Sequence, residues 1–249
     1  MKNFHLKRRF ATIILISVNI LISYGQIPNG IYTDTLQNNG TETVHQIKIK
    51  DDYFIYNAYE IEPAKFIKTV GGFFQIENTA TNKLLVVLLE FNSNYENDAV
   101  RQLSIPTEMD GEKLKMNWFQ QLTLTPLYPN TQDLDGTWLF ATRGPDTGQK
   151  RRGEESTRKT LKFLMNNTFQ WIAYDTESFR FSGTGGGAYS AENGIYKEHI
   201  EFFSKDNTRV GAQLQFNYKL EENDWHHTGK NSKGAPMYEI WSKRVTSVE

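Results

Sequence analysis

The chain has no cysteine among its 249 residues. Disulfide bonds are therefore excluded, and the fold has to be held together by burial alone. A cysteine nucleophile is excluded too, as is a lipid attached to a cysteine behind an N-terminal signal. Such a composition is common in exported bacterial proteins and unusual in small secreted animal domains, which are rich in disulfides.

A surplus of positive charge is also missing. The chain carries 28 Lys and Arg against 29 Asp and Glu, which gives a formal net charge of −1. Proteins that bind nucleic acid concentrate Lys and Arg on one face. The balance of charges therefore predicts that nucleic acid is not a partner.

Long apolar runs are missing after residue 25, so no later segment predicts a membrane span. The first 25 residues have the parts of a secretory signal: four basic residues, an apolar stretch from Phe10 to Ile22, and small residues Ser23 and Gly25. We predict a signal peptide over residues 1–25, cleaved before Gln26; the alternative is a retained membrane anchor. Cleavage lowers the formal net charge to −5 and predicts an exported protein, periplasmic or extracellular.

The rest of the chain repeats itself. The stretch from Asp52 aligns with the stretch from Asn167 at a constant offset of 115, with identities at Phe54/Phe169, Ala58/Ala173, Tyr59/Tyr174, Glu62/Glu177, Phe66/Phe181, Thr69/Thr184, Gly71/Gly186, Gly72/Gly187, Glu77/Glu192 and Asn78/Asn193. Two copies of one unit follow from this match. We predict a first, degenerate copy over residues 26–126, a linker over 127–134, and a second copy over 135–249.

Long amphipathic helices are absent from the pattern as well. Segments such as TLKFLM, TFQWIAY and IYKEHIEFF alternate apolar with polar residues, and short turn sequences such as Asn193-Gly194 separate them. The second copy contains about eight such segments at hairpin spacing. The predicted fold class is all-β, with two tandem antiparallel up-and-down β-barrels after the signal peptide.

Glycines cluster in the sequence SGTGGGAYS, residues 182–190. The cluster matches a loose dinucleotide-binding pattern, but that motif needs a helix after it, and another strand pattern follows here. A Walker-type loop would need Lys-Ser or Lys-Thr, where Ala188-Tyr189 stand. Both copies share only the pair Gly71-Gly72 and Gly186-Gly187. We therefore predict a bulge or bend in a closed sheet.

The second copy resembles the lipocalin-like secreted proteins of the Bacteroidetes, a family of largely unassigned function. The resemblance rests on DGTW, FSGTGGGAYS, GIYKEHIEFFSKD, RVGAQLQF, DWHHTG and EIWSKR, and it covers residues 133–244. It implies a calycin-type barrel and a secreted protein. In lipocalins a G-x-W motif packs its indole beneath a late arginine, which implies a cation–π contact between Trp138 and Arg244.

Two places in the second copy could carry chemistry. Alternation puts Glu198 on a mainly apolar strand face, where it could act as an acid or base, anchor a ligand, or form a buried pair with an Arg or Tyr. His226 and His227 are adjacent and point to opposite faces of a strand, so they cannot chelate one ion together. No metal site and no cofactor is predicted.

The leading functional hypothesis is a binding protein for a small apolar or glycan-like molecule inside the second barrel. Its predicted ligand-binding residues are Trp171, Tyr189, Glu198, Gln213, Gln215, Trp225, His227 and Trp241. The same aromatics could instead fill the barrel solid, and the protein would then be a structural or interaction protein of the cell envelope, with a partner that is unknown. An enzyme using dispersed residues such as Glu198 or His227 is the third candidate, because no catalytic motif is recognisable.

One strand pattern in the first copy concerns how the copies meet. The sequence KLLVVLLEF, residues 83–91, is apolar on both faces. A strand with two apolar faces is covered on both sides. We therefore expect the second barrel to dock against this strand.

Overall fold

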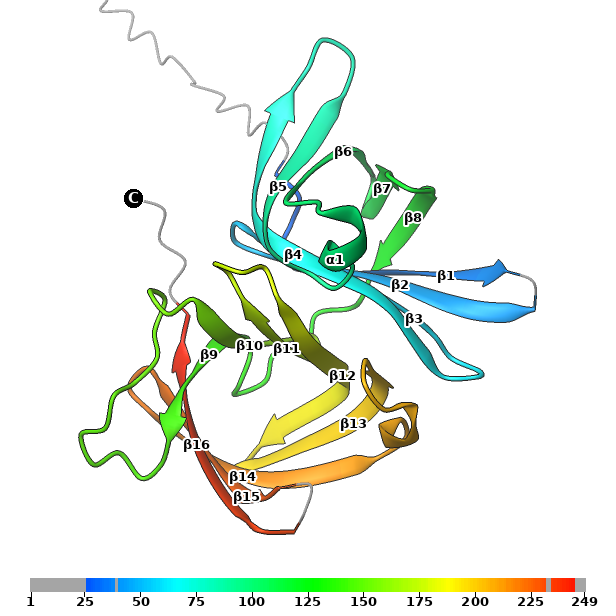
Figure 1. Ribbon diagram of the computed structural model, residues 1–249. Helices are drawn as coiled ribbons and strands as arrows, with labels where there is room; N and C mark the ends of the chain where they lie inside the picture. The colour runs from blue at the N-terminus through cyan, green and yellow to red at the C-terminus, as the bar shows by residue number, and fades with distance from the viewer. Residues whose placement is uncertain (1–25, 39, 232–233, 245–249) are drawn as a thin grey trace, which may run out of the picture.

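The structure, a computed structural model, describes residues 26–38, 40–231 and 234–244. It consists of two closed antiparallel barrels of eight strands each, arranged in tandem (Figure 1). The predicted fold class is confirmed. The predicted signal peptide lies outside the described residues. Among the described residues, no helix combines the length and the apolar character needed to cross a membrane.

In each barrel the strands follow chain order, and the last strand pairs with the first. The first barrel consists of β1 (Gly30–Asn38), β2 (Thr41–Lys50), β3 (Tyr53–Glu60), β4 (Lys65–Asn78), β5 (Lys83–Asn92), β6 (Gln102–Asp110), β7 (Lys113–Asn117) and β8 (Gln121–Pro126). A single helical turn, α1 (Tyr95–Asp98), connects β5 to β6.

The second barrel begins ten residues after β8 ends. It consists of β9 (Gly136–Arg143), β10 (Arg158–Met165), β11 (Thr168–Asp175), β12 (Phe181–Glu192), β13 (Ile195–Phe203), β14 (Gln213–Glu221), β15 (Asp224–Lys230) and β16 (Pro236–Lys243). A 3₁₀ turn, η1 (Asn207–Arg209), lies between β13 and β14. Several hairpins turn at residues with positive φ, as the turn sequences predict, for example Asn193 and Gly194.

The shared glycine pair marks a β-bulge in each barrel. The register between β4 and β5 shifts at Gly71/Gly72, and the register between β12 and β13 shifts at Gly186/Gly187. A Cβ on Gly72 would lie 2.0 Å from the carbonyl oxygen of Leu88, and one on Gly187 would lie 2.1 Å from that of His199. No side chain fits at such distances. The predicted bulge is confirmed, and close backbone contact is its physical reason.

A short segment before the first strand closes one end of each barrel. In the second barrel the indole Nε1 of Trp138 donates to the carbonyl oxygen of Leu134 (2.9 Å). In the first barrel the hydroxyl of Tyr32 donates to the carbonyl oxygen of Pro28 (2.8 Å) in the same way. The expected contact between Trp138 and Arg244 is wrong. The guanidinium of Arg244 instead packs on two rings of the first barrel, those of Tyr53 and Phe73, with centroids at 4.6 and 4.8 Å.

Arg244 belongs to a buried charge cluster between the barrels. Its guanidinium forms two hydrogen bonds of 2.9 Å with the carboxylate of Glu90 on β5. Lys159 on β10 lies 3.4 Å from the same carboxylate, and Glu154 contacts both cations. Burial alone would raise the pKa of Glu90, but the charge and hydrogen bonds of Arg244 outweigh it and lower that pKa. The cluster therefore holds Glu90 ionised in the interface.

The two barrels contact each other reciprocally. The hydroxyl of Tyr174 in the second barrel donates to Glu90 Oε2 in the first (2.9 Å). The hydroxyl of Tyr59 in the first barrel donates to Glu201 Oε2 in the second (3.0 Å). Tyr59 and Tyr174 are equivalent in the repeat, and Glu90 and Glu201 are the extra residues of the two equivalent bulges. The duplicated units therefore use the same patch on both sides, as in an isologous dimer.

Ring contacts follow the same reciprocity. Phe91 lies against Tyr174 with centroids 5.0 Å apart, and Phe202 lies against Tyr59 with centroids 4.9 Å apart. The apolar core of the interface combines side chains of both barrels: Ile31, Tyr53, Ile55 and Phe91 with Leu139, Leu161, Phe163, Ile172 and Tyr174. The second barrel covers β5 only at its C-terminal end, where Glu90 and Phe91 lie. Leu88, further back on the same strand, is 64% exposed. The expectation that both faces of this strand are covered is thus wrong for Leu88.

A row of buried polar side chains crosses the interface beside this apolar core. Gln46, Asn57 and Thr69 are paired across β2, β3 and β4, and Gln170 of β11 donates to the hydroxyl of Thr69 (3.1 Å). Next to the row, the fully buried ammonium of Lys48 donates to Gln46 Oε1 (2.5 Å). Within the part of the chain that the structure describes, no carboxylate lies at hydrogen-bond distance from this ammonium, which is unusual for a buried lysine.

Candidate functional site

The middle of the second barrel contains a buried ion pair. Lys162 of β10 and Glu198 of β13 point into the barrel, and Lys162 Nζ lies 3.0 Å from Glu198 Oε1. The hydroxyl of Tyr196 donates to the same oxygen (2.7 Å). Each charged side chain is only 7% exposed. A buried pair of this kind is tolerated because each charge has a partner, and removing one partner would leave the other uncompensated.

Three aromatic rings surround the ammonium of Lys162. Its Nζ lies 5.0 Å from the ring centroid of Tyr196, 4.8 Å from that of Trp225 and 5.1 Å from that of Trp241. The negative faces of aromatic rings attract a cation, most strongly where water is excluded. The interior is therefore a polar centre, Lys162 and Glu198, inside an aromatic wall.

His227 borders this centre and is 2% exposed. Its ring lies 4.4 Å from the ring of Phe216 and 5.0 Å from that of Trp225, between centroids. Its Nδ1 is 3.6 Å from Glu239 Oε2, which is too long for a hydrogen bond. Burial, together with the charge of Lys162, lowers the pKa of His227. The imidazole is therefore uncharged at neutral pH, with one nitrogen as donor and the other as acceptor.

Hydrogen-bonding capacity is left over in this interior. The indole Nε1 of Trp225 and both ring nitrogens of His227 are buried without a hydrogen-bond partner among the described residues. Buried polar groups are normally paired, because an unpaired one costs about 1–3 kcal/mol. Such groups can pair with a bound molecule or with water. Both side-chain amide atoms of Asn57 and the Oε1 of Gln170, in the row between the barrels, are also buried without a partner in the described part of the chain.

The two ends of the barrel differ. The segment before β9 closes one end: the hydroxyl of Tyr189 donates to Asp135, and that of Tyr218 donates to Asp133. The other end is lined by apolar side chains that are only partly buried, Phe140, Trp171, Phe203, Ala212 and Met237. A ligand would therefore enter past these residues.

The interior of the first barrel can be compared with that of the second position by position, because the strand registers of the two barrels are equivalent. Where the second barrel has Lys162, Tyr196, Glu198, Phe216, Trp225, His227, Glu239 and Trp241, the first has Ile47, Leu85, Val87, Ile105, Leu114, Met116, Leu122 and Leu124. These side chains form one apolar cluster. The buried polar contact inside the first barrel lies elsewhere, between His45 Nδ1 and the hydroxyl of Tyr56 (2.8 Å). The fold therefore closes without an ion pair at these positions, and among the described residues the Lys162–Glu198 centre has no counterpart in the first barrel.

The structure separates the residues predicted from the sequence into two groups. Inside the second barrel lie Tyr189, Glu198, Trp225, His227 and Trp241, and Trp171 stands at the open end against Phe203. Gln213 and Gln215 are exposed on the outer face of β14. Lys162 was not predicted, because alternation along β10 places it on the face opposite Leu161 and Phe163, and that apolar pair turns out to pack against the first barrel instead of filling the interior.

The adjacent histidines lie on opposite faces, as predicted. His227 points inward, whereas His226 is half-buried on the outer face and contacts the hydroxyl of Tyr238 through Nδ1 (2.8 Å). Among the described residues, no group of three or more His, Asp or Glu side chains could hold a metal ion.

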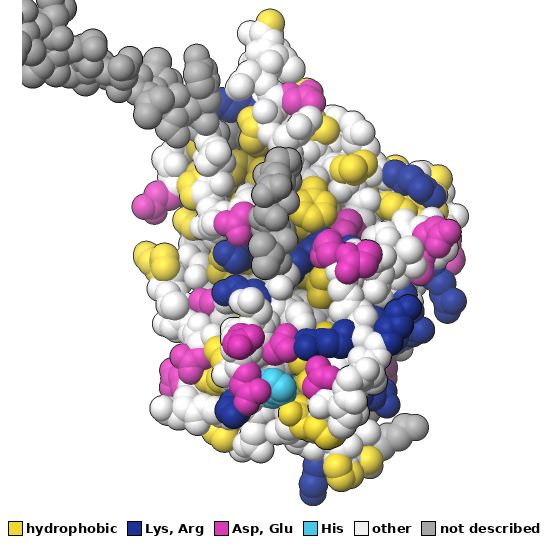
Figure 2. Space-filling model, turned by 90° about the vertical axis from the view of Figure 1, so that its left-hand side faces the viewer, with side chains coloured by type: hydrophobic (Ala, Val, Ile, Leu, Met, Phe, Trp, Pro, Cys, Tyr) yellow, Lys and Arg dark blue, Asp and Glu magenta, His cyan; other side chains and the backbone are white. Residues whose placement is uncertain are grey.

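The long loop between β9 and β10 carries charges of both signs. Arg151 pairs with Asp146 (3.2 Å) and with Asp224 at the start of β15 (2.7 Å). Figure 2 shows acidic and basic side chains interspersed over this side of the molecule. The loop is therefore a surface of mixed charge, in which Arg151 links the loop to the start of β15.

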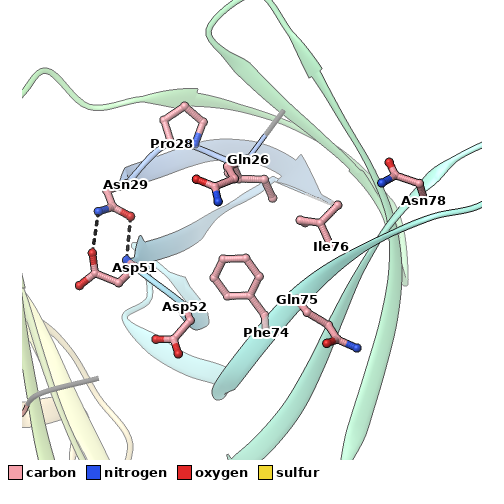
Figure 3. A pocket seen from close by; sticks show the side chains of 10 residues that line it. Gln26, Pro28, Asn29, Asp51, Asp52, Phe74, Gln75, Ile76 and Asn78 are labelled. Atoms are coloured by element: carbon pink, nitrogen blue, oxygen red, sulfur yellow. Dashed lines mark hydrogen bonds between the residues drawn. The ribbon is translucent and has the colours of Figure 1, made fainter. Parts of the chain in front are cut away.

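The first barrel has a hollow of about 650 Å³ at its closed end (Figure 3). Its wall includes Asn29, Asp51, Asp52, Phe74 and Ile76. Asn29 Nδ2 donates to Asp51 Oδ1 (3.1 Å), and the backbone N–H of Asp51 donates to Asn29 Oδ1 (2.7 Å). Asn29 and Asp51 thus satisfy each other, whereas Oδ1 of Asp52 in the same wall is buried without a hydrogen-bond partner among the described residues.

No family model and no curated protein matches the sequence. Among solved structures the chain is similar to the crystal structure of an uncharacterized protein from Saccharomyces cerevisiae. The sequence identity is 8% and the TM-score is 0.45, over 88% of this chain and 100% of that one. A likeness this distant carries no functional information.

Proposed function

We propose that the protein is an exported, lipocalin-like binding protein whose second barrel holds a small, largely apolar molecule with oxygen atoms at one end. One observation carries the proposal: the positions of Lys162, Glu198 and the side chains around them are apolar and carry no charge in the first barrel, whereas they are charged, polar or aromatic in the second. A fold that closes with an apolar interior does not require a buried Lys162–Glu198 pair. Such a pair is costly, and a functional role explains its presence.

The chemistry of the interior supports this class of ligand. The rings of Phe140, Trp171 and Phe203 at the open end offer an apolar contact surface. Deeper in, the N–H of Trp225 and the ring of His227 lack partners, so an oxygen acceptor fits there. Hydroxyl and carboxyl oxygens meet this requirement, and small-molecule sites typically combine apolar walls with a few such polar groups.

A second candidate function is an interaction protein with solid barrels. The observation that favours it is that the ammonium of Lys162 already occupies the space between Tyr196, Trp225 and Trp241. In that case the polar centre only fixes the packing of the interior, and no small molecule enters.

Titrations with decanoate and with cellobiose, followed by tryptophan fluorescence and native mass spectrometry, distinguish the two. We expect saturable binding of decanoate, weakened about tenfold by Trp225→Phe, which keeps an aromatic side chain and removes the indole N–H donor. Cellobiose, which is polar on all sides, should not bind. His227→Ala should weaken decanoate binding as well, and His226→Ala, at the adjacent outward position, should not. If decanoate does not bind, or if both histidine variants bind it alike, the proposal is overturned.

Export is part of the proposal and rests on the N-terminal sequence alone. A bacterial periplasm or the cell exterior suits a chain without cysteine and with a signal-like segment over residues 1–25. N-terminal sequencing of the protein recovered from the periplasm or culture medium should begin at Gln26. Recovery of the uncleaved chain from the membrane fraction would instead support the anchor.

A further inference from the structure

The outer face of the second barrel carries a hollow of about 490 Å³ across β12, β13 and β14. It is lined by three consecutive residues of each strand: Ala188, Tyr189 and Ser190; Lys197, Glu198 and His199; Gln213, Leu214 and Gln215. Tyr189 and Glu198 are buried and point into the barrel, so their strands contribute backbone to the floor. The side chains between them form the walls. This hollow is separate from the interior site.

The wall side chains stand in two straight rows. The register pairs Ser190 with Lys197 and Lys197 with Gln215 in one row, and His199 with Gln213 in the other. Directly opposed residues of an antiparallel sheet have Cβ atoms about 4.5–5.5 Å apart, so neighbouring members of a row can contact the same ligand. A sheet is also a rigid support, which limits the entropy lost on binding.

The polar side chains in these rows are available to a ligand. Lys197, His199, Gln213 and Gln215 are exposed, and none forms a side-chain hydrogen bond or ion pair with another described residue. Together they offer an ammonium, an imidazole and two primary amides around one hollow. Glu198, the one acidic residue of the lining, directs its carboxylate inward to Lys162. The hollow therefore presents donors, amide acceptors and no outward carboxylate.

The first barrel again shows that the fold does not require this surface. The positions equivalent to Lys197 and His199 are Val86 and Leu88, and the position equivalent to Ala188 is Phe73. Gln102 and Ser104 take the places of Gln213 and Gln215. Lys197 and His199 thus replace apolar residues of the first copy, whereas the amide of Gln213 has a counterpart in Gln102. The change at the two solvent-facing positions of β13 is not required for packing, which points to a property of the surface.

We propose that this outer hollow binds an acidic saccharide. Primary amides hydrogen-bond as donors and acceptors, as do the hydroxyl groups of a sugar, so Gln213 and Gln215 match adjacent hydroxyls. Lys197 supplies the cation for a carboxylate, in a charge-assisted hydrogen bond that is stronger than a neutral one. The volume suits one or two sugar rings. The site is distinct from the interior of the barrel. The proposal does not depend on the proposed interior ligand.

The test uses ¹⁵N-labelled full-length protein titrated with trigalacturonate and, separately, with neutral maltotriose. We expect saturable amide shifts confined to β12, β13 and β14 with trigalacturonate, and weaker binding of maltotriose. The double variant Gln213→Ala/Gln215→Ala should bind trigalacturonate about tenfold more weakly, because two hydrogen-bonding groups are lost. Lys197→Met should bind the two saccharides alike. All of these positions are exposed, so the barrel is expected to fold.

The matched control is Gln102→Ala/Ser104→Ala, which changes the equivalent positions of the first barrel. It should bind trigalacturonate as the unaltered protein does. The proposal is overturned if trigalacturonate causes no saturable shift, if the shifts lie elsewhere, or if both double variants bind equally well. Decanoate binding inside the barrel should be the same in every one of these variants, so a failure here leaves the interior proposal standing.

Discussion

Replacing Lys48 by Met should stabilise the protein at neutral pH. The lysine is 0% exposed between the barrels, and its one hydrogen bond goes to the side chain of Gln46. Burial lowers the pKa of Lys48 from 10.5 to about 7, although the charge of Glu201 works in the opposite direction. The folded protein therefore holds this proton far less tightly than the unfolded chain does.

The magnitude follows from linkage between protonation and folding. Each unit of pKa difference corresponds to about 1.4 kcal/mol, so the shift from 10.5 to about 7 costs the folded state about 5 kcal/mol at most. Between these two values the unfolded chain binds a proton that the folded protein lacks, so stability falls as the pH is lowered through this range. Below pH 7 both states are protonated and the loss is constant. The cost is about 4 kcal/mol at pH 7 and about 2 kcal/mol at pH 9.

Methionine has a similar length and carries no charge, so Lys48→Met removes this cost. It also leaves the Oε1 of Gln46 without its donor, at about 1 kcal/mol, so the net gain at pH 7 is about 3 kcal/mol. Urea unfolding at pH 7 and pH 9 measures the difference in unfolding free energy from the unaltered protein. That difference should shrink by about 2 kcal/mol between the two values.

Lys197→Met is the matched control, because Lys197 is exposed on β13. It should change the unfolding free energy by less than about 0.5 kcal/mol at either pH. The reasoning is refuted if Lys48→Met destabilises the protein at pH 7, or if its effect is the same at pH 7 and pH 9. Either result would mean that Lys48 is charged and well paired in the folded state.

Two further substitutions test the bulges and the interface. Gly187→Ala places a Cβ 2.1 Å from the carbonyl oxygen of His199, so the unfolding free energy should fall by about 3 kcal/mol or more, as measured by thermal and urea unfolding; an unchanged melting temperature would contradict this. Glu90→Gln leaves the buried guanidinium of Arg244 with only the half-exposed carboxylate of Glu154, which should cost about 3 kcal/mol in the same assay; a loss below about 1 kcal/mol would show that Glu154 and water compensate for the lost charge.

The strands, their order and the bulges could be predicted because their causes are local. Alternation with period two and turn residues such as Asn193-Gly194 determine where a strand runs and ends. The glycine pair was interpretable for the same reason, since a missing Cβ permits close backbone approach wherever it occurs. The duplication supports the same prediction, because the glycine pair and the alternating strand pattern occur in both copies.

The docking of the second barrel against the end of the strand at residues 83–91 was predicted, and Glu90 and Phe91 confirm it. The rest of the interface could not be predicted because its causes are long-range. Lys48 occupies an outward position of β2, and alternation assigns such a lysine to solvent; only the second barrel buries it. Arg244 was expected beside Trp138 within its own barrel, yet it contacts Tyr53 and Phe73 of the other one. In the interior, Glu198 was recognised as buried, while its partner Lys162 was not. Pairing across strands depends on register, which composition does not reveal.

Residues that are the same in both copies of this protein serve its structure, and residues that differ between the copies are the candidates for its function. The shared glycines let a phenylalanine ring lie on the strand: a Cβ on Gly71 would lie 2.6 Å from the ring of Phe91, and one on Gly186 would lie 2.6 Å from that of Phe202. The bulges made there direct Glu90 and Glu201 at the opposite barrel, so the common motif serves docking. The interior has changed chemistry between the copies, and so have the outward positions of Lys197 and His199 on β13, although the same backbone would tolerate either. Ligand recognition is therefore to be sought where the copies differ, and mutations at shared positions should act on stability alone.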